Sequence, residues 1–372
     1  MTTISDIIRP IEAFAPAAWQ EEWDNAGWQV APTDPGTTPC LGVLVALDMT
    51  EEALQEAVEA GCNLVVCHHP LFFRGVKRLV GATLQQRIAA EAIRHGVAIY
   101  AAHTNLDVAP GGVSARLAEK LGLREVRVLA PRENRLMKLV FYTPSAYAEP
   151  VRTAVWEAGA GCIGRYEACS FNCEGTGTFR AAAPECRPFV GSVGELHAEQ
   201  EIRTEVVVPK ERISAAIRAL REVHPYEEPA YDLIPLALPD PRVGLGCVGE
   251  LPEEVPVAEF LGRVARAIGT SCLKHSPIAS ETVRRVAVCG GSGAEFIPEA
   301  MVRGAQVYLT ADLKYHDFQR AEGRITLVDG GHFETERQAV DLFCELISKK
   351  FPNFAVRRAG ETGAVGYFFD GR

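Results

Sequence analysis

The sequence predicts an α/β fold in two blocks, one toward each end of the chain, with a ferredoxin-like α+β module inserted between them. Two observations predict the blocks: short, almost wholly apolar runs alternate with amphipathic stretches, and glycines end several of those stretches. A third observation, an apparent β-α-β-β-α-β order in the middle of the chain, predicts the insertion. The 372 residues are too many for one ordinary domain.

The N-terminal block, residues 1–130, contains three short runs that are nearly free of polar side chains. Such runs are typical of strands that are covered on both faces in a mostly parallel sheet. They are LGVLVAL (41–47), CNLVVC (62–67) and VAIYAA (97–102). The amphipathic stretches stop at Gly61, Gly96 and Gly122, as helices do when glycine forms the C-cap.

Residues 131–238 differ from both blocks. A strand-like segment begins near Leu136, an amphipathic stretch lies around 148–159, and further strand-like and helix-like segments continue to Pro235. Glycine and proline between 175 and 191 mark the central turns. This order predicts a ferredoxin-like insertion.

The alternation of the first block returns in residues 239–372. Strands are predicted at RRVAVC (284–289), AQVYLT (305–310) and RITLV (324–328), and a helix is predicted to begin near Phe333. From these patterns alone, the two blocks could form one composite domain or two separate ones.

Composition and charge limit the classes of function. Hydrophobic residues make up 47% and charged residues 23% of the chain, which is an ordinary globular balance. The net charge of −10 argues against nucleic acid and anionic membranes as partners, because both attract lysine and arginine. No apolar run approaches the roughly 18–20 residues of a spanning helix, and no signal peptide is recognisable. We expect a soluble, cytoplasmic protein.

Two adjacent histidines, His68 and His69, directly follow the predicted strand 62–67. Ligands collect at the carboxyl ends of strands in parallel α/β sheets. Because Pro70 disfavours helical backbone at His69, we expect both residues to be extended and their imidazoles to point in roughly opposite directions. Two neighbouring metal ions, each binding one imidazole, fit that geometry better than one ion. The alternative is a strand-end pair packed against a loop.

Two further strand ends carry candidate ligands. Asp107 offers a hard oxygen ligand, and His103 before it could orient a ligand or transfer a proton. His332 and Glu336 follow the last predicted strand and lie four residues apart, so they share one face of a helix start. Each segment also has a plainer interpretation, because such residues are common in turns and in first helical turns.

Together these segments supply three imidazoles and two carboxylates as candidate metal ligands. The ligand set is His68, His69, Asp107, His332 and Glu336. It suits two divalent ions with positions left open for water, as catalytic sites require. Paired ions about 3.5–4 Å apart acidify water and stabilise both attacking and leaving oxygens. Hydrolysis is therefore the expected reaction class.

Several short motifs span nearly the whole chain in a fixed order. They are WDNAG (23–27), ALDMT (46–50), HHP (68–70), HTNLD (103–107), CGGSG (289–293), DLKYH (312–316) and GHFETE (331–336). In these motifs the sequence resembles the family of GTP cyclohydrolase 1 type 2 homologues, also described as Nif-three-like or dinuclear-metal-centre hexameric proteins. The resemblance implies that residues 1–130 and 239–372 fold together as one discontinuous α/β domain, and that subunits form a toroidal homohexamer.

The resemblance also implies how the metals are held. It places His68 and Asp107 on one ion, His69 and His332 on the other, and Glu336 on both. We expect two divalent ions per subunit, with zinc preferred and iron or manganese as alternatives, because imidazole and carboxylate accept all three.

Residues 131–238 resemble PII-like and CutA-like trimeric signalling modules, most clearly at HPYEEP (224–229). This segment is either a trimer contact or ligand cleft, or simply a rigid turn. Asp312 and His316 could orient a ligand or transfer a proton; alternatively Asp312 caps a helix and His316 lies on its surface. GGSG (290–293) could hold a phosphate on its backbone amides or form a tight turn.

Two classes of function follow. The first is a metal-dependent hydrolase acting on a small molecule; the family name suggests GTP ring opening with release of formate, although phosphoesters and cyclic amides suit the same metals. The second is a non-catalytic metal-binding or regulatory hexamer whose PII-like insertion senses a small molecule.

Overall fold

The chain divides into two compact units in the computed structural model, which describes residues 1–360 and 363. Unit 1 joins residues 1–130 to the chain from Arg242 onward, and unit 2 is Pro131–Pro241. Within the described residues, no helix combines the length and the apolar character needed to cross a membrane.

Unit 1 contains a five-stranded sheet, sheet 1, with the order β1-β4-β3-β2-β15. Its strands are β1 (Gly27–Val30), β2 (Val43–Ala46), β3 (Leu64–Cys67), β4 (Ala98–Ala101) and β15 (Val356–Arg358). All neighbours pair in parallel except β1, which pairs antiparallel with β4. The three apolar runs of the N-terminal block therefore form adjacent parallel strands.

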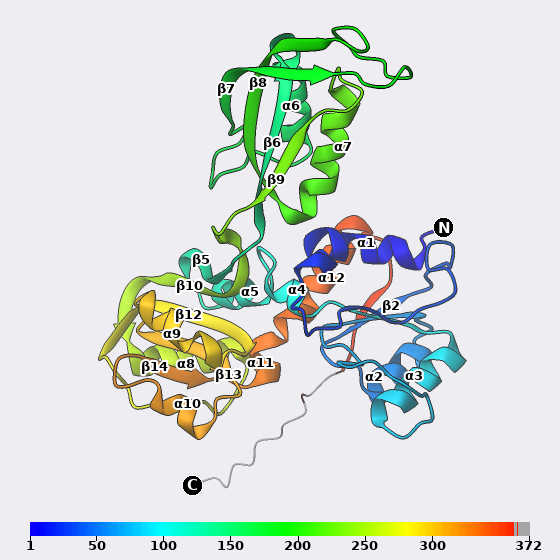
Figure 1. Ribbon diagram of the computed structural model, residues 1–372. Helices are drawn as coiled ribbons and strands as arrows, with labels where there is room; N and C mark the ends of the chain where they lie inside the picture. The colour runs from blue at the N-terminus through cyan, green and yellow to red at the C-terminus, as the bar shows by residue number, and fades with distance from the viewer. Residues whose placement is uncertain (361–362, 364–372) are drawn as a thin grey trace, which may run out of the picture. The chain divides into compact units, whose positions relative to one another are not determined.

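Helices cover both faces of sheet 1 (Figure 1). The helices are α1 (Ile4–Phe14) and α12 (Gln338–Lys350) on one face, and α2 (Glu51–Glu59) and α3 (Leu84–His95) on the other. Val43 and Val45 of β2 pack toward α1 and α12, whereas Leu44 and Ala46 pack toward α2 and α3. Because successive side chains enter different cores, every position of the strand is apolar.

The second sheet of unit 1, sheet 2, has six strands in the order β11-β14-β13-β12-β10-β5. They are β5 (Arg124–Arg132), β10 (Asp240–Pro256), β11 (Lys274–His275), β12 (Thr282–Ser292), β13 (Val307–Ala311) and β14 (Thr326–Asp329). The central β12, β13 and β14 are parallel. Helices α5 (Val113–Lys120) and α8 (Val257–Ile268) pack on one face, and α9 (Ile297–Val302) and α10 (Tyr315–Gln319) on the other.

The two ends of the chain exchange elements within unit 1. Strand β15, from the C-terminal block, extends sheet 1 beside β2, while β5, from the N-terminal block, pairs with β10 in sheet 2. Helix α12 likewise covers sheet 1, and α5 covers sheet 2. The blocks therefore form one composite unit, because separating them would remove a strand from each sheet.

Unit 2 contains a four-stranded antiparallel sheet with the order β7-β8-β6-β9 and two helices that pack on one face of it. Its elements are β6 (Leu136–Pro144), α6 (Ala148–Glu157), β7 (Phe171–Arg180), β8 (Leu196–Pro209), α7 (Ile213–Val223) and β9 (Tyr231–Pro235). The chain thus follows the β-α-β-β-α-β order of a split β-α-β module.

Candidate metal centre

Four histidines at strand ends of unit 1 each have Nδ1 bonded to a fixed acceptor. The Nδ1 partners are the carbonyl oxygen of Ala102 for His68 (2.8 Å), Asp48 Oδ1 for His69 (2.8 Å), Asp24 Oδ1 for His103 (2.8 Å) and Asp312 Oδ2 for His332 (2.7 Å). Proteins orient metal-binding histidines by such contacts. The arrangement leaves Nε2 of each ring available to a ligand.

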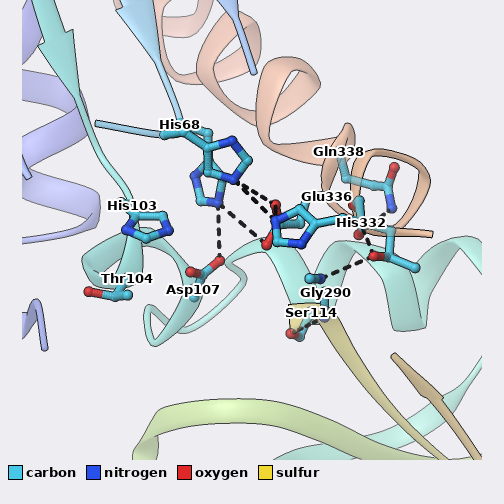
Figure 2. A network of polar contacts seen from close by, with 12 residues as sticks. His68, His103, Thr104, Asp107, Ser114, Gly290, His332, Glu336 and Gln338 are labelled. Atoms are coloured by element: carbon cyan, nitrogen blue, oxygen red, sulfur yellow. Dashed lines mark hydrogen bonds and ion pairs between the residues drawn. The ribbon is translucent and has the colours of Figure 1, made fainter. Parts of the chain in front are cut away.

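Glu336 lies among these histidines, at the end of the short helix α11 (His332–Glu336). Its Oε2 is 2.9 Å from His69 Nε2 and 2.9 Å from His332 Nε2. Its Oε1 faces His68 Nε2 at 4.0 Å. Figure 2 shows His68 and His332 on either side of this carboxylate, which is buried.

Two buried atoms of the centre, His68 Nε2 and Asp107 Oδ1, have no hydrogen-bond partner among the described residues, and lie 3.5 Å apart. Asp107 ends the short helix α4 (Thr104–Asp107). Burial lowers the pKa of His68 to about 3, so its ring is neutral and Nε2 carries a lone pair. Burial and the nearby Glu336 carboxylate raise the pKa of Asp107 well above its usual value. Buried polar atoms without partners are rare, and a metal ion would satisfy both.

The ligand atoms fall into three overlapping groups, each with its atoms within 4.8 Å of one another. The groups are His68, Asp107 and Glu336; His69, His332 and Glu336; and His68, His69 and His103. Imidazole and carboxylate together suit borderline divalent cations. The residues present therefore fit a metal centre, and Glu336 belongs to two of its three groups.

His68 and His69 do not point in opposite directions, so that prediction from the sequence is wrong. Their ring centroids lie 5.1 Å apart with the planes at 45°. Both backbone amides donate to the same carbonyl oxygen, that of Leu47, at 3.1 and 3.0 Å. The chain therefore bends directly after β3 instead of continuing as an extended strand, and both rings reach Glu336.

Gly291 of the GGSG segment makes room for the carboxylate of Glu336. Gly291 has φ +65°, and a Cβ placed on it would lie 1.9 Å from Glu336 Oε1. Its amide donates to Thr335 Oγ1 at 3.0 Å, and the amide of Gly290 donates to Ser114 Oγ at 3.1 Å. These amides are already bonded within the chain, which argues against a phosphate cradle here.

Asp312 and His316 have different environments in the structure, and only Asp312 contacts a candidate metal ligand. Asp312 accepts from His332 and is not a helix cap, since Lys314 occupies the N-cap position of α10. His316 lies on the exposed surface of α10, where its Nδ1 is 3.1 Å from Gln319 Oε1, and it belongs to none of the three ligand groups.

Two carboxylates that orient histidines of the centre, Asp24 and Asp48, are not predicted as site residues from the sequence. The side chain of Asp24 is fully buried and also accepts from the amide of Thr104 at 3.1 Å. Burial opposes its ionisation, but the hydrogen bond and charge of His103 outweigh burial and lower the pKa of Asp24 to about 2. Asp48 follows the predicted strand 41–47, so the strand-end rule could have found it; no comparable signal marks Asp24.

A cavity of about 1150 Å³ opens onto the centre. His69, His103, Asp107, His332 and Glu336 line it, whereas His68 does not, so the cavity reaches His103 and four of the five candidate ligands.

We expect metal binding to release protons. Burial opposes charge on His69 and His332, but the hydrogen bonds that these rings donate to Asp48, Asp312 and Glu336 outweigh it and raise the pKa values to about 10 and about 9. Both rings are therefore protonated in the metal-free protein at neutral pH, and each must lose its proton to bind a metal. Apparent affinity should rise with pH below about 9, by up to about two decades per unit.

Calorimetric titration of Zn²⁺ at pH 7, repeated in buffers of different ionisation enthalpy, measures this release. His69 and His332 together should contribute close to two protons per chain; a release near zero would contradict the assignment of these two histidines.

The fold and the site together define a mixed α/β protein with a candidate centre for divalent metal ions. Residues 2–360 match the model of the Duf34/NIF3 (NGG1p interacting factor 3) family, and the chain belongs to this family. A Bacillus subtilis relative named GTP cyclohydrolase 1 type 2 homolog is 40% identical over 329 residues, covering 88% of this chain and 87% of the relative.

Solved structures share the whole fold. A Bacillus cereus protein related to NIF3 superposes with a TM-score of 0.82 at 35% identity, over 99% of both chains. A Staphylococcus aureus protein superposes with a TM-score of 0.76 at 26% identity, again over 99% of both.

Proposed function

We propose that unit 1 is a metal-dependent hydrolase that holds two divalent ions, zinc in preference to iron or manganese. The observation that carries the proposal is a buried pair of ligand atoms that make no hydrogen bond, His68 Nε2 and Asp107 Oδ1, beside a carboxylate shared by two ligand groups. A site built only to support the fold would be expected to pair these atoms within the chain.

Two of the ligand groups give the proposed distribution of ligands. His68 and Asp107 would hold one ion, His69 and His332 the other, and Glu336 would contact both. Such ions, when bound, make water acidic and polarise a carbonyl or phosphoryl oxygen. The chain fixes its ligands beforehand, since Asp48 and Asp312 hold the imidazoles of His69 and His332 in place.

His103 is the proposed proton-transfer group. Asp24 accepts from its Nδ1 and sets the ring orientation, so Nε2 is the nitrogen left to exchange a proton with a substrate in the cavity. The ring centroid of His103 lies 5.3 Å from that of His68 and 5.5 Å from that of His69. A proton carried by His103 would therefore lie beside the proposed metal ligands.

The names of the relatives supply a first substrate. GTP ring opening with release of formate is the reaction we propose to assay first, with phosphoesters and cyclic amides as further candidates.

The family resemblance supports two further proposals. One is that residues 131–238 form a PII-like or CutA-like module that binds a small molecule, and the other is that subunits assemble as a toroidal homohexamer. If the ions prove to be structural or stored, a non-catalytic regulatory assembly becomes the better proposal.

The test is turnover by metal-loaded protein, with formate or phosphate release as the readout. His103→Gln should lower kcat about 10²- to 10⁴-fold while metal content stays unchanged, because it removes proton transfer but leaves the five proposed ligands. His316→Gln, on the surface of α10, is the matched control and should keep the full rate.

Absence of turnover on every substrate would remove the hydrolase proposal and favour the non-catalytic assembly. Full activity in His103→Gln would instead remove His103 from the reaction.

A further inference from the structure

We propose that the centre takes a planar heteroaromatic substrate without phosphate groups, either uncharged or cationic, and that Trp23 and Phe73 contact its ring beside His103. This inference rests on the proposed function for the reaction, but it concerns how the cavity selects its ligand. Two independent features carry it: exposed aromatic rings around His103, and a lining without lysine or arginine.

The aromatic rings lie next to the proposed proton-transfer group. Trp23 packs edge to face with His103, with centroids 5.9 Å apart, and Phe73 does the same at 5.6 Å. Both line the cavity, yet Trp23 is 63% and Phe73 50% exposed. Large exposed aromatic side chains at a cavity mouth are typical of surfaces on which a planar ligand stacks.

The segments that carry these rings are held firmly. Asn25 Nδ2 donates to the carbonyl oxygen of Phe72 at 2.6 Å, which ties the neighbours of Trp23 and Phe73 together. Asp24, between Trp23 and Asn25, is anchored by His103 and by the amide of Thr104. Backbone anchoring and the edge-to-face contacts with His103 therefore hold the rings in place, and their exposed surfaces remain free to pack on a ligand.

The charge of the cavity disfavours phosphate. The lining within the described residues contains no lysine or arginine, while Glu52, Glu56 and Glu295 belong to none of the metal-ligand groups and line it as carboxylates. Proteins bind phosphates with lysine, arginine or free backbone amides. The amides of Gly290 and Gly291 are already bonded to hydroxyl groups. A triphosphate would therefore meet these carboxylates without a lysine or arginine to balance its charge.

Calorimetric binding to the full-length protein tests this inference, with four probes that separate ring from charge. Guanosine and GTP share one ring and differ in phosphate, 1-methylnicotinamide is a cationic ring, and ribose 5-phosphate has phosphate without a ring. We expect guanosine and 1-methylnicotinamide to bind at least about tenfold more tightly than GTP to metal-free protein, and ribose 5-phosphate not to bind.

Trp23→Leu and Phe73→Leu should each weaken the ring probes about fivefold to a hundredfold, the usual effect of losing one stacking side chain. Tyr315→Leu is the matched control, because Tyr315 is 75% exposed and packs against His316 at 5.2 Å but does not line the cavity. Trp23→Phe keeps a ring and should retain most of the affinity. Thermal unfolding of each variant checks that the fold is intact.

Tighter binding of GTP or ribose 5-phosphate than of guanosine would overturn the inference, as would unchanged ring affinity in both leucine variants. Ring binding without turnover would remove the hydrolase proposal alone. Turnover of a phosphoester by a protein that binds no ring would remove this inference alone.

Discussion

Replacing Glu336 by glutamine is expected to abolish stable metal binding. Glu336 belongs to two of the three ligand groups. Its Oε2 lies 2.9 Å from Nε2 of His69 and 2.9 Å from Nε2 of His332. Glutamine keeps the size of the side chain but removes its negative charge. Mutation of residues that only orient metal ligands typically lowers metal affinity about 10- to 100-fold. Loss of a ligand shared by two ions should therefore lower the affinity at least about 100-fold.

Elemental analysis of the purified protein and calorimetric titration with Zn²⁺ provide the measurement. We expect about two divalent ions per chain in the unaltered protein and a fall at both positions in Glu336→Gln. Glu334→Gln is the matched control: it makes the same change two residues earlier in α11, at a position outside the ligand groups. Unchanged metal content in Glu336→Gln would remove this residue from the centre.

Substituting Gly291 by alanine should both destabilise unit 1 and disrupt the centre. An L-residue at φ +65° costs about 1–2 kcal/mol. The added Cβ would also lie 1.9 Å from Glu336 Oε1. An exposed glutamate could swing away, but Glu336 is buried and bonded to two histidines, so its movement breaks those contacts. With overpacking of about 1–3 kcal/mol, the expected loss of stability is about 2–5 kcal/mol.

Denaturant unfolding of the metal-free protein gives the stability change, and titration with Zn²⁺ gives the accompanying loss of affinity. Gly96→Ala is the matched control, since Gly96 has the same φ of +65° but no atom within 4 Å of an added Cβ. It should cost only the backbone strain and leave metal binding unchanged. Equal stability losses in the two variants would show that contact with Glu336 does not matter.

The secondary structure near the centre could be predicted because its signals are local. The runs 41–47, 62–67 and 97–102 contain β2, β3 and β4, since burial on both faces leaves almost no polar position in such strands. Boundaries were less accurate: the predicted helix near Phe333 is two helices, α11 and α12. His68, His69, Asp107 and His332 could be proposed as ligands because each closely follows a strand whose end is recognisable.

Other features required contacts between distant residues. The opposite directions predicted for His68 and His69 failed because the carbonyl oxygen of Leu47, twenty-one residues before His68, accepts from both amides and bends the chain. The orientation of His103 by Asp24 spans 79 residues. Neither contact leaves a periodic or local pattern in the sequence.

The sequence by itself determined the strands and helices around the centre, the residues at the strand ends, and the family to which the chain belongs. Only the tertiary structure decided that β5 and β15 are exchanged between the sheets, that Glu336 meets the two histidines that follow β3, and that Gly291 leaves room for its carboxylate. The physical reason is the sequence separation between the residues that interact. Burial patterns and caps depend on neighbours within a few residues, whereas a site of this kind depends on packing that brings together side chains 267 residues apart.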